Sequence, residues 1–264
     1  MPVEQAATGS LVADYAAHGW SGLPARLGPD RVAELRAAIE RISAQDRPEV
    51  VHEAGSSVVR AVHGCHRHDD GCARLVRHPA LVDAAEALLG TPAYVYQFKV
   101  NLKQPRLGAA WPWHRDYPFW RTEDGMPEPR ALTIALLLDD VDSTNGPLTV
   151  IPGTHLLDVP ERVGAGEADW RSHVSADLPH RVDGAVARHL AEAHGTVELT
   201  GPAGTLFAFH PNLVHSSAEN RSDRGRALLL ITYNSVTNAP RSPTRPDFLV
   251  DRDTTPVTRL ASTR

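Results

Sequence analysis

The chain has 264 residues, of which 42% are hydrophobic and 22% charged, an ordinary balance for a protein that closes its own core. The net charge of −5 and the lack of a basic run disfavour nucleic acids and anionic membranes as partners. Two cysteines, Cys65 and Cys72, make a disulfide scaffold unexpected and fit a reducing, cytoplasmic location. The N-terminus shows no signal-peptide pattern, and no apolar run of about 18 residues predicts a membrane span. The 14 histidines point weakly to metal or acid–base chemistry.

The first third of the chain, to about residue 92, has helical patterning. Gly28-Pro29-Asp30 is typical of a helix start, and one face of the helix that follows is apolar. A second helix is expected from Pro79 to a stop at Gly90. The apolar positions of the two helices are Val32, Leu35, Ile39 and Ile42, and Leu81, Val82, Ala85, Leu88 and Leu89.

From residue 93 the hydrophobic period changes to two, which predicts strands. In the run 93–103, one face carries Gln97, Lys99 and Asn101, and the other carries Phe98, Val100 and Leu102. Further strand-like runs, separated by Gly, Pro, Asn or Asp breaks, are 131–138, 147–151, 196–199, 205–209 and 226–234.

Helices followed by many short strands predict one mainly β domain with flanking helices, a sandwich or jelly roll. The expected parts are a helical segment over about 1–92 and a jelly-roll core over about 93–237. A polar insertion over about 158–194 is a candidate lid, and the tail 238–264 is expected to wrap the surface.

His114-Arg115-Asp116 is the first candidate for a metal site. Iron oxygenases without haem hold Fe(II) with two His and one carboxylate, which often reads as His-x-Asp followed by a distant His. The composition alone gives roughly two His-x-acid triplets by chance, and His68-Asp69-Asp70 is a second match. His68 lies in a polar run, whereas the aromatic residues of 111–120 flank His114 and suit a site shielded from water.

The second histidine of such a site should lie downstream at a strand end. His215 is favoured because Leu213-Val214 leads into it and a polar turn follows. His210 precedes a proline and has an alternative role as a capping or buried hydrogen-bonded residue.

A carboxylate cosubstrate would need a cation, and three arginines follow His215. Arginine suits this role because it can hold a carboxylate with two parallel hydrogen bonds. Arg226 begins an apolar strand and can point into a barrel. Arg221 and Arg224 lie in a polar loop, where solvation is the better interpretation.

At these residues the sequence resembles the phytanoyl-CoA dioxygenase superfamily, and most closely its bacterial branch of hydroxylases that act on free amino acids and ectoine. The likeness spans nearly the whole chain. The segments that carry it are 60–66, 96–101, 111–120, 123–127, 145–147, 151–155, 232–234 and 245–256.

The resemblance implies a double-stranded β-helix that uses Fe(II), the cosubstrate 2-oxoglutarate and O2. It assigns His114, Asp116 and His215 to the metal and Arg226 to the distal carboxylate of 2-oxoglutarate. It also assigns Lys99, Asn101 and Thr133 to the cosubstrate pocket, and Gln97 and Trp120 to the substrate.

The implied reaction is hydroxylation of an sp3 C–H bond in a small polar substrate, a free L-amino acid that is proline-like or aliphatic, with release of succinate and CO2. Asp116 favours hydroxylation, because halogenases of this type need a small residue there. Ectoine or another natural-product intermediate is the alternative substrate.

Other interpretations are a non-oxygenase cupin or a zinc protein. The run from Cys65 through His66 and His68 to Cys72 has a spacing that is unusual for zinc. His155 reads as a hydrogen-bonded turn residue. Two departures from the family pattern remain open, Ser216 in place of glycine and Arg115 between the first two ligands.

Overall fold

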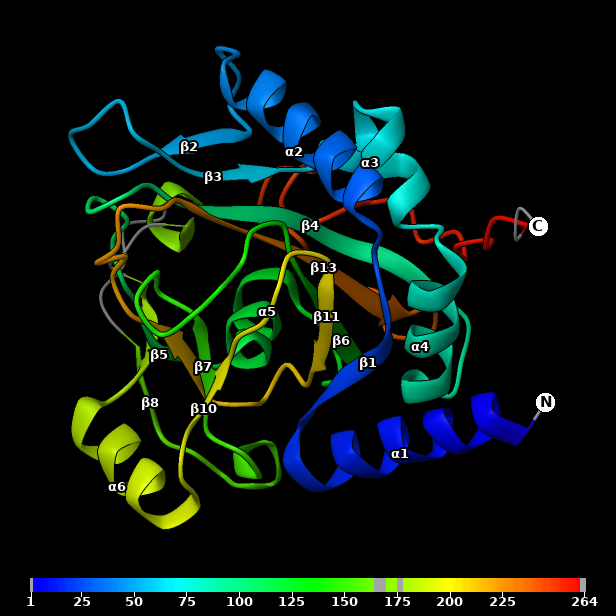
Figure 1. Cartoon of the computed structure of the whole chain (residues 1–264). Coiled ribbons are helices and arrows are strands. Elements are labelled where there is room, and N and C mark those ends of the chain that lie inside the picture. The colour runs from blue at the N-terminus through cyan, green and yellow to red at the C-terminus, as the bar shows by residue number, and fades with distance from the viewer. Residues whose placement is uncertain (1, 164–169, 175–177, 262–264) are drawn as a thin grey trace.

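Two antiparallel sheets pack face to face, and helices cover the outside of the larger one (Figure 1). The computed structural model describes residues 2–163, 170–174 and 178–261. The larger sheet has the strand order β1-β11-β6-β13-β4-β3-β2. Its strands are β1 (Trp20–Arg26), β2 (Val50–His52), β3 (Val59–His63), β4 (Ala93–Lys103), β6 (Ala131–Leu137), β11 (Thr205–Phe209) and β13 (Arg226–Ser235).

The smaller sheet has the order β10-β7-β12-β5 and consists of short strands. They are β5 (Trp111–His114), β7 (Leu148–Val150), β10 (Val197–Leu199) and β12 (His215–Ser217). Its side chains Leu148, Val150 and Leu199 pack against Leu228 and Leu230 of the larger sheet in one apolar cluster. A separate hairpin pairs β8 (Glu161–Val163) with β9 (His180–Val182).

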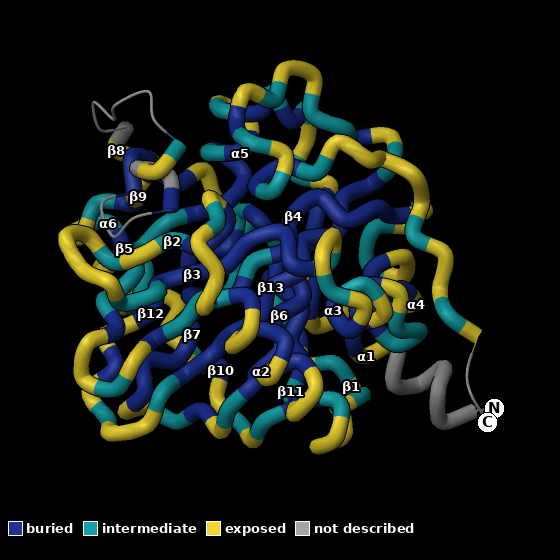
Figure 2. The backbone as a smooth tube through the Cα atoms, turned by 90° about the horizontal axis from the view of Figure 1, so that it is seen from above, coloured by how far each residue is buried: buried dark blue, intermediate teal, exposed yellow. Residues whose placement is uncertain are grey.

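The other face of the larger sheet packs against helices in the main apolar core. Leu35 and Ile39 of one helix and Leu81 of another join Phe98 and Val100 of β4 there. The helices are α1 (Pro2–His18), α2 (Pro29–Ser43), α3 (Asp70–Leu75), α4 (Pro79–Leu89), α5 (Asp116–Asp124) and α6 (Gly184–His194), with short 3-10 turns at Cys65–Arg67, Thr154–Leu156 and Trp170–Val174. The central strands are buried in Figure 2, whereas exposed residues lie at the periphery.

The alternating pattern of β4 places its side chains as expected. Phe98 and Val100 face the helices, and Gln97, Lys99 and Asn101 face the space between the sheets. The predicted helices are α2 and α4, and the five other strand runs are β6, β7, β10, β11 and β13. The predicted jelly roll with flanking helices is therefore confirmed.

The first third of the chain, where helical patterning was expected, holds α1 to α4 but also contains strands. β1, β2 and β3 lie there and extend both edges of the larger sheet. β1 is the edge strand beside β11, and it contains a glycine and a proline, so its sequence lacks a clear strand period. Within the described residues, no helix has both the length and the apolar character of a membrane span.

The insertion and the tail also differ from their simple expectations. The insertion 158–194 holds β8, β9 and α6, and its proposed lid role falls partly on 164–169 and 175–177, which lie outside the described residues. The tail does more than wrap the surface, because Arg245, Leu249 and Val250 are buried in the interior.

Candidate active site

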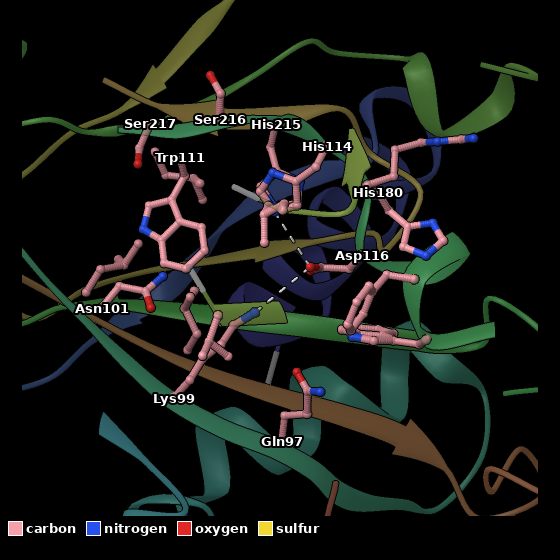
Figure 3. A pocket seen from close by; sticks show the side chains of 18 of the residues that line it. Gln97, Lys99, Asn101, Trp111, His114, Asp116, His180, His215, Ser216 and Ser217 are labelled. Carbon is pink, nitrogen blue, oxygen red and sulfur yellow. Dashed lines mark ion pairs between the residues drawn. The ribbon is translucent and has the colours of Figure 1, made fainter. Parts of the chain in front are cut away.

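The three predicted metal ligands come together where the short strands of the smaller sheet meet helix α5. His114 ends β5 and faces His215, the first residue of β12, in the strand register. Their ring centroids are 4.1 Å apart. Asp116 opens α5, and one ligand atom from each of the three residues lies within 4.8 Å of the others (Figure 3).

Backbone hydrogen bonds hold Asp116 beside the second histidine. The amides of Asp116 and Tyr117 both donate to the carbonyl of Pro211, at 2.9 and 3.0 Å. Pro211 lies in the turn that leads into β12, so the start of α5 is tied to the strand that carries His215. In the His-x-Asp motif, His114 is thus the last residue of a strand and Asp116 the first residue of a helix.

Both imidazoles make their hydrogen bond through Nδ1, so Nε2 keeps its lone pair for a ligand at the centre of the triad. Nδ1 of His114 donates to the carbonyl of Pro112 at 2.7 Å, and Nδ1 of His215 donates to that of Leu213 at 2.9 Å. A neutral imidazole that carries its proton on Nδ1 has an unprotonated Nε2, which is the form that binds metal.

Burial and neighbouring charges set the protonation states that a metal requires. Burial lowers the pKa of His114 to about 3 and also lowers that of His215. Burial raises the pKa of Asp116, but the charge of Lys99, whose Nζ lies 3.9 Å from Oδ1, brings it below its usual value. Neutral imidazoles and an ionised carboxylate are the states that a divalent cation selects.

The triad therefore fits Fe(II). Oδ2 of Asp116 is buried and has no hydrogen-bond partner in the described part of the chain, which leaves it free to bind a metal. Two nitrogen donors and one carboxylate on one side of a cavity are the arrangement of iron oxygenases without haem.

Arg226 lies in the same cavity at the start of β13, directly opposite Lys103 of β4. It is 3% exposed, and burial lowers its pKa to about 9. Its Nε and Nη2 donate to the carbonyl of Gly146, while its Nη1 is buried with no partner among the described residues. A buried guanidinium with a spare donor fits the distal carboxylate of 2-oxoglutarate. By contrast, Arg221 and Arg224 are exposed.

Of the remaining predicted site residues, four line the cavity and one does not. Gln97, Lys99, Asn101 and Trp120 are part of its wall. Thr133 lies in the core of β6, where its Oγ1 is 3.0 Å from the hydroxyl of Thr232, and it is not among the lining residues.

The two departures from the family pattern have different surroundings. Ser216 is buried and lines the cavity beside His215. Arg115 directs its guanidinium to the insertion, with Nε 3.1 Å from Oε1 of Glu161 and Nη2 2.6 Å from the carbonyl of Val159. Arg115 therefore links the metal-binding turn to the β8–β9 hairpin.

The competing histidines have structural partners. His68 pairs with Glu49 at 3.3 Å, and Asp69 caps α3. Nδ1 of His210 accepts a hydrogen bond from the amide of Asn212, and Nε2 of His155 donates to the carbonyl of Ala16. Across the ranges that the structure describes, His114, Asp116 and His215 form the one cluster of three or more such side chains able to hold a metal ion.

Several cavity residues were not assigned from the sequence. The space inside the cavity, counted together with its open mouth, is about 910 Å³. Trp111 and Ser217 lie to the left of the triad in Figure 3, on the side of Asn101, and His180 lies to its right. His63 and Arg245 also line it. Both lie in segments that carry the family resemblance, which was their available signal.

The comparisons with known proteins agree with this geometry. The family model for phytanoyl-CoA dioxygenase (PhyH) matches residues 15–228. The chain is 56% identical over 254 residues to the L-proline trans-4-hydroxylase of Streptomyces griseoviridis, with 95% of each chain covered. It is 34% identical over 252 residues to an ectoine dioxygenase of Nocardia farcinica, with 90% of this chain and 83% of that one covered.

Solved structures of a related protein share the fold. EctD from S. alaskensis in its apoform superposes with a TM-score of 0.81 at 32% identity, covering 94% of this chain and 85% of that one. The same protein with 2-oxoglutarate and 5-hydroxyectoine gives 0.80 at 31% identity, with 95% and 86% covered. The chain therefore belongs to the phytanoyl-CoA dioxygenase family and is a non-haem Fe(II)/2-oxoglutarate-dependent dioxygenase.

Proposed function

We propose that this enzyme hydroxylates free L-proline at C4 on the trans face and converts 2-oxoglutarate to succinate and CO2. The observation that carries the proposal is the 56% identity to an L-proline trans-4-hydroxylase over 95% of both chains. An alignment over 95% of both chains extends far beyond the metal motif.

In this proposal His114, Asp116 and His215 hold iron through two Nε2 atoms and the carboxylate. Bound iron supplies the redox chemistry that couples decarboxylation of 2-oxoglutarate to hydroxylation of a C–H bond. Arg226 offers its Nη1 to the distal carboxylate of 2-oxoglutarate, and the β4–β13 register puts it opposite Lys103, two residues along β4 from Asn101. The aromatic and apolar wall excludes water from the reacting atoms.

The carboxylate of proline needs a cation of its own, and Arg245 is placed to provide it. Asp124 accepts hydrogen bonds from Nε and Nη2 of Arg245, which leaves Nη1 for a ligand. The Cζ atom of the guanidinium lies 4.7 Å from the ring centroid of Phe119, in a cation–π contact. Gln97 and Trp120 complete this end of the cavity.

The experiment is turnover of purified enzyme with Fe(II), 2-oxoglutarate and O2, with L-proline, L-leucine and ectoine supplied in turn. We expect succinate and trans-4-hydroxy-L-proline in equal amounts, identified by chromatography against the cis-4 and both 3-hydroxy isomers. A higher kcat/KM for ectoine would refute the substrate assignment and leave the reaction class intact.

A further inference from the structure

His63 is a cavity residue without a role in the site described above. It ends β3 and pairs in register with Lys99 of β4. Side chains opposite one another in an antiparallel pair point to the same face of the sheet. His63 therefore faces the cavity in the same row as Lys99 and diagonally next to Gln97, and it is part of the cavity wall.

The position of His63 is fixed, but one of its ring nitrogens has no partner. Its amide donates to the carbonyl of Glu49 at 3.0 Å, and the next amide, of Gly64, donates to that of Phe98 at 2.8 Å. The side chain is 5% exposed, and its Nε2 is buried without a hydrogen bond to any described residue. A buried polar atom left unpaired on the wall of a ligand site indicates a partner on the ligand.

The surroundings of His63 keep its ring neutral. Burial, and then Lys99 and Arg245, lower its pKa to about 3. Lys99 and Arg245 already supply donors for anionic groups at this end of the cavity. A positively charged group of a ligand needs a hydrogen-bond acceptor instead. A carboxylate at position 63 would pair with those cations, whereas a neutral imidazole stays available as an acceptor.

We propose that Nε2 of His63 accepts a hydrogen bond from the ammonium group of the substrate and so makes the enzyme specific for amino acids over carboxylic acids of the same shape. This inference rests on the proposed function, because it assumes that an amino acid occupies the cavity. The zwitterion then lies with its carboxylate toward Arg245 and its nitrogen toward His63, and Gln97 offers a second acceptor.

The test compares L-proline with cyclopentanecarboxylate, in which a methylene replaces the nitrogen, in the wild-type enzyme and two variants. His63→Phe keeps an aromatic ring and removes the acceptor, and His63→Gln places an amide oxygen near the position of Nε2. Affinities are read from KM and from perturbation of the visible band of the anaerobic Fe(II)–2-oxoglutarate complex. Melting temperature and KM for 2-oxoglutarate report on folding and on the metal site.

We expect His63→Phe to raise KM for L-proline about ten- to a hundred-fold, the effect of losing a hydrogen bond to a charged group. Affinity for cyclopentanecarboxylate should change less than about threefold, and His63→Gln should recover most of the loss for L-proline. Equal weakening of both ligands, or no weakening of L-proline, would overturn the inference while wild-type turnover of L-proline stands. Failure of the wild-type enzyme to bind or hydroxylate L-proline overturns the proposed function and this inference together.

Discussion

Replacing Arg226 with methionine should raise the stability of the enzyme without 2-oxoglutarate and remove most of its affinity for that cosubstrate. Burial lowers the pKa of Arg226 from 12.5 to about 9. At about 1.4 kcal/mol per unit of pKa, keeping the guanidinium charged in the folded protein costs about 5 kcal/mol. Loss of its hydrogen bonds leaves the carbonyl of Gly146 unsatisfied, at about 2 kcal/mol. The net gain in the free energy of unfolding is about 3 kcal/mol.

The effect on 2-oxoglutarate has the opposite sign. Removal of one partner from a buried ion pair costs about 3–5 kcal/mol, so the dissociation constant should rise about a hundred- to several-thousand-fold. Thermal melts with and without 2-oxoglutarate, and anaerobic titration of the visible band, measure the two effects separately. Arg221→Met is the matched control, because Arg221 is an exposed arginine on the preceding loop. A lower melting temperature for the free variant, or an affinity for 2-oxoglutarate within threefold of wild type, would show that Arg226 does not meet the cosubstrate.

Three further changes test other parts of the site. Asp116→Ala should abolish both hydroxylation and the visible band, because the site loses its one anionic ligand; detectable turnover would contradict the ligand assignment. Asp124→Asn should raise KM for L-proline about tenfold or more and leave KM for 2-oxoglutarate unchanged, since Asp124 orients Arg245; parallel changes in both constants would argue against that role. Below pH 6.5 His63 binds a proton in the unfolded chain, whereas in the folded protein it stays neutral down to about pH 3, so the free energy of unfolding decreases as the pH is lowered. In urea titrations His63→Gln should therefore reduce the loss of stability between pH 7 and pH 5 by about 2 kcal/mol, and an unchanged loss would contradict the burial of a neutral His63.

The long central strands could be predicted because burial of one or both faces of a strand gives a recognisable pattern of apolar residues in the sequence. The alternation of β4 correctly divided Gln97, Lys99 and Asn101 from the core-facing residues. The choice of His215 over His210 rested on the apolar approach to a strand end, and the structure places His215 in register with His114. Local pattern sufficed here because each feature depends on neighbours in the chain.

The short strands and the far end of the cavity could not be predicted in the same way. β5 and β12 have four and three residues, too few for a period, and their pairing is decided by contacts distant in sequence. Arg245 reads as a charged residue in a Pro-rich tail, yet Asp124 neutralises it in the interior. The direction of Arg115 likewise depends on Glu161, 46 residues away along the chain.

The charges of the cavity connect the metal site, the cosubstrate site and the proposed substrate site. Lys99 and Arg226 face the interior against Asp116, and Arg245 is balanced by Asp124. Once a divalent metal binds, the positive surplus grows, and a dianion such as 2-oxoglutarate offsets more of it than a zwitterion does. Electrostatics therefore favours 2-oxoglutarate as the first organic ligand. The amino acid then enters a cavity that is close to balanced, where individual hydrogen bonds rather than net charge select it.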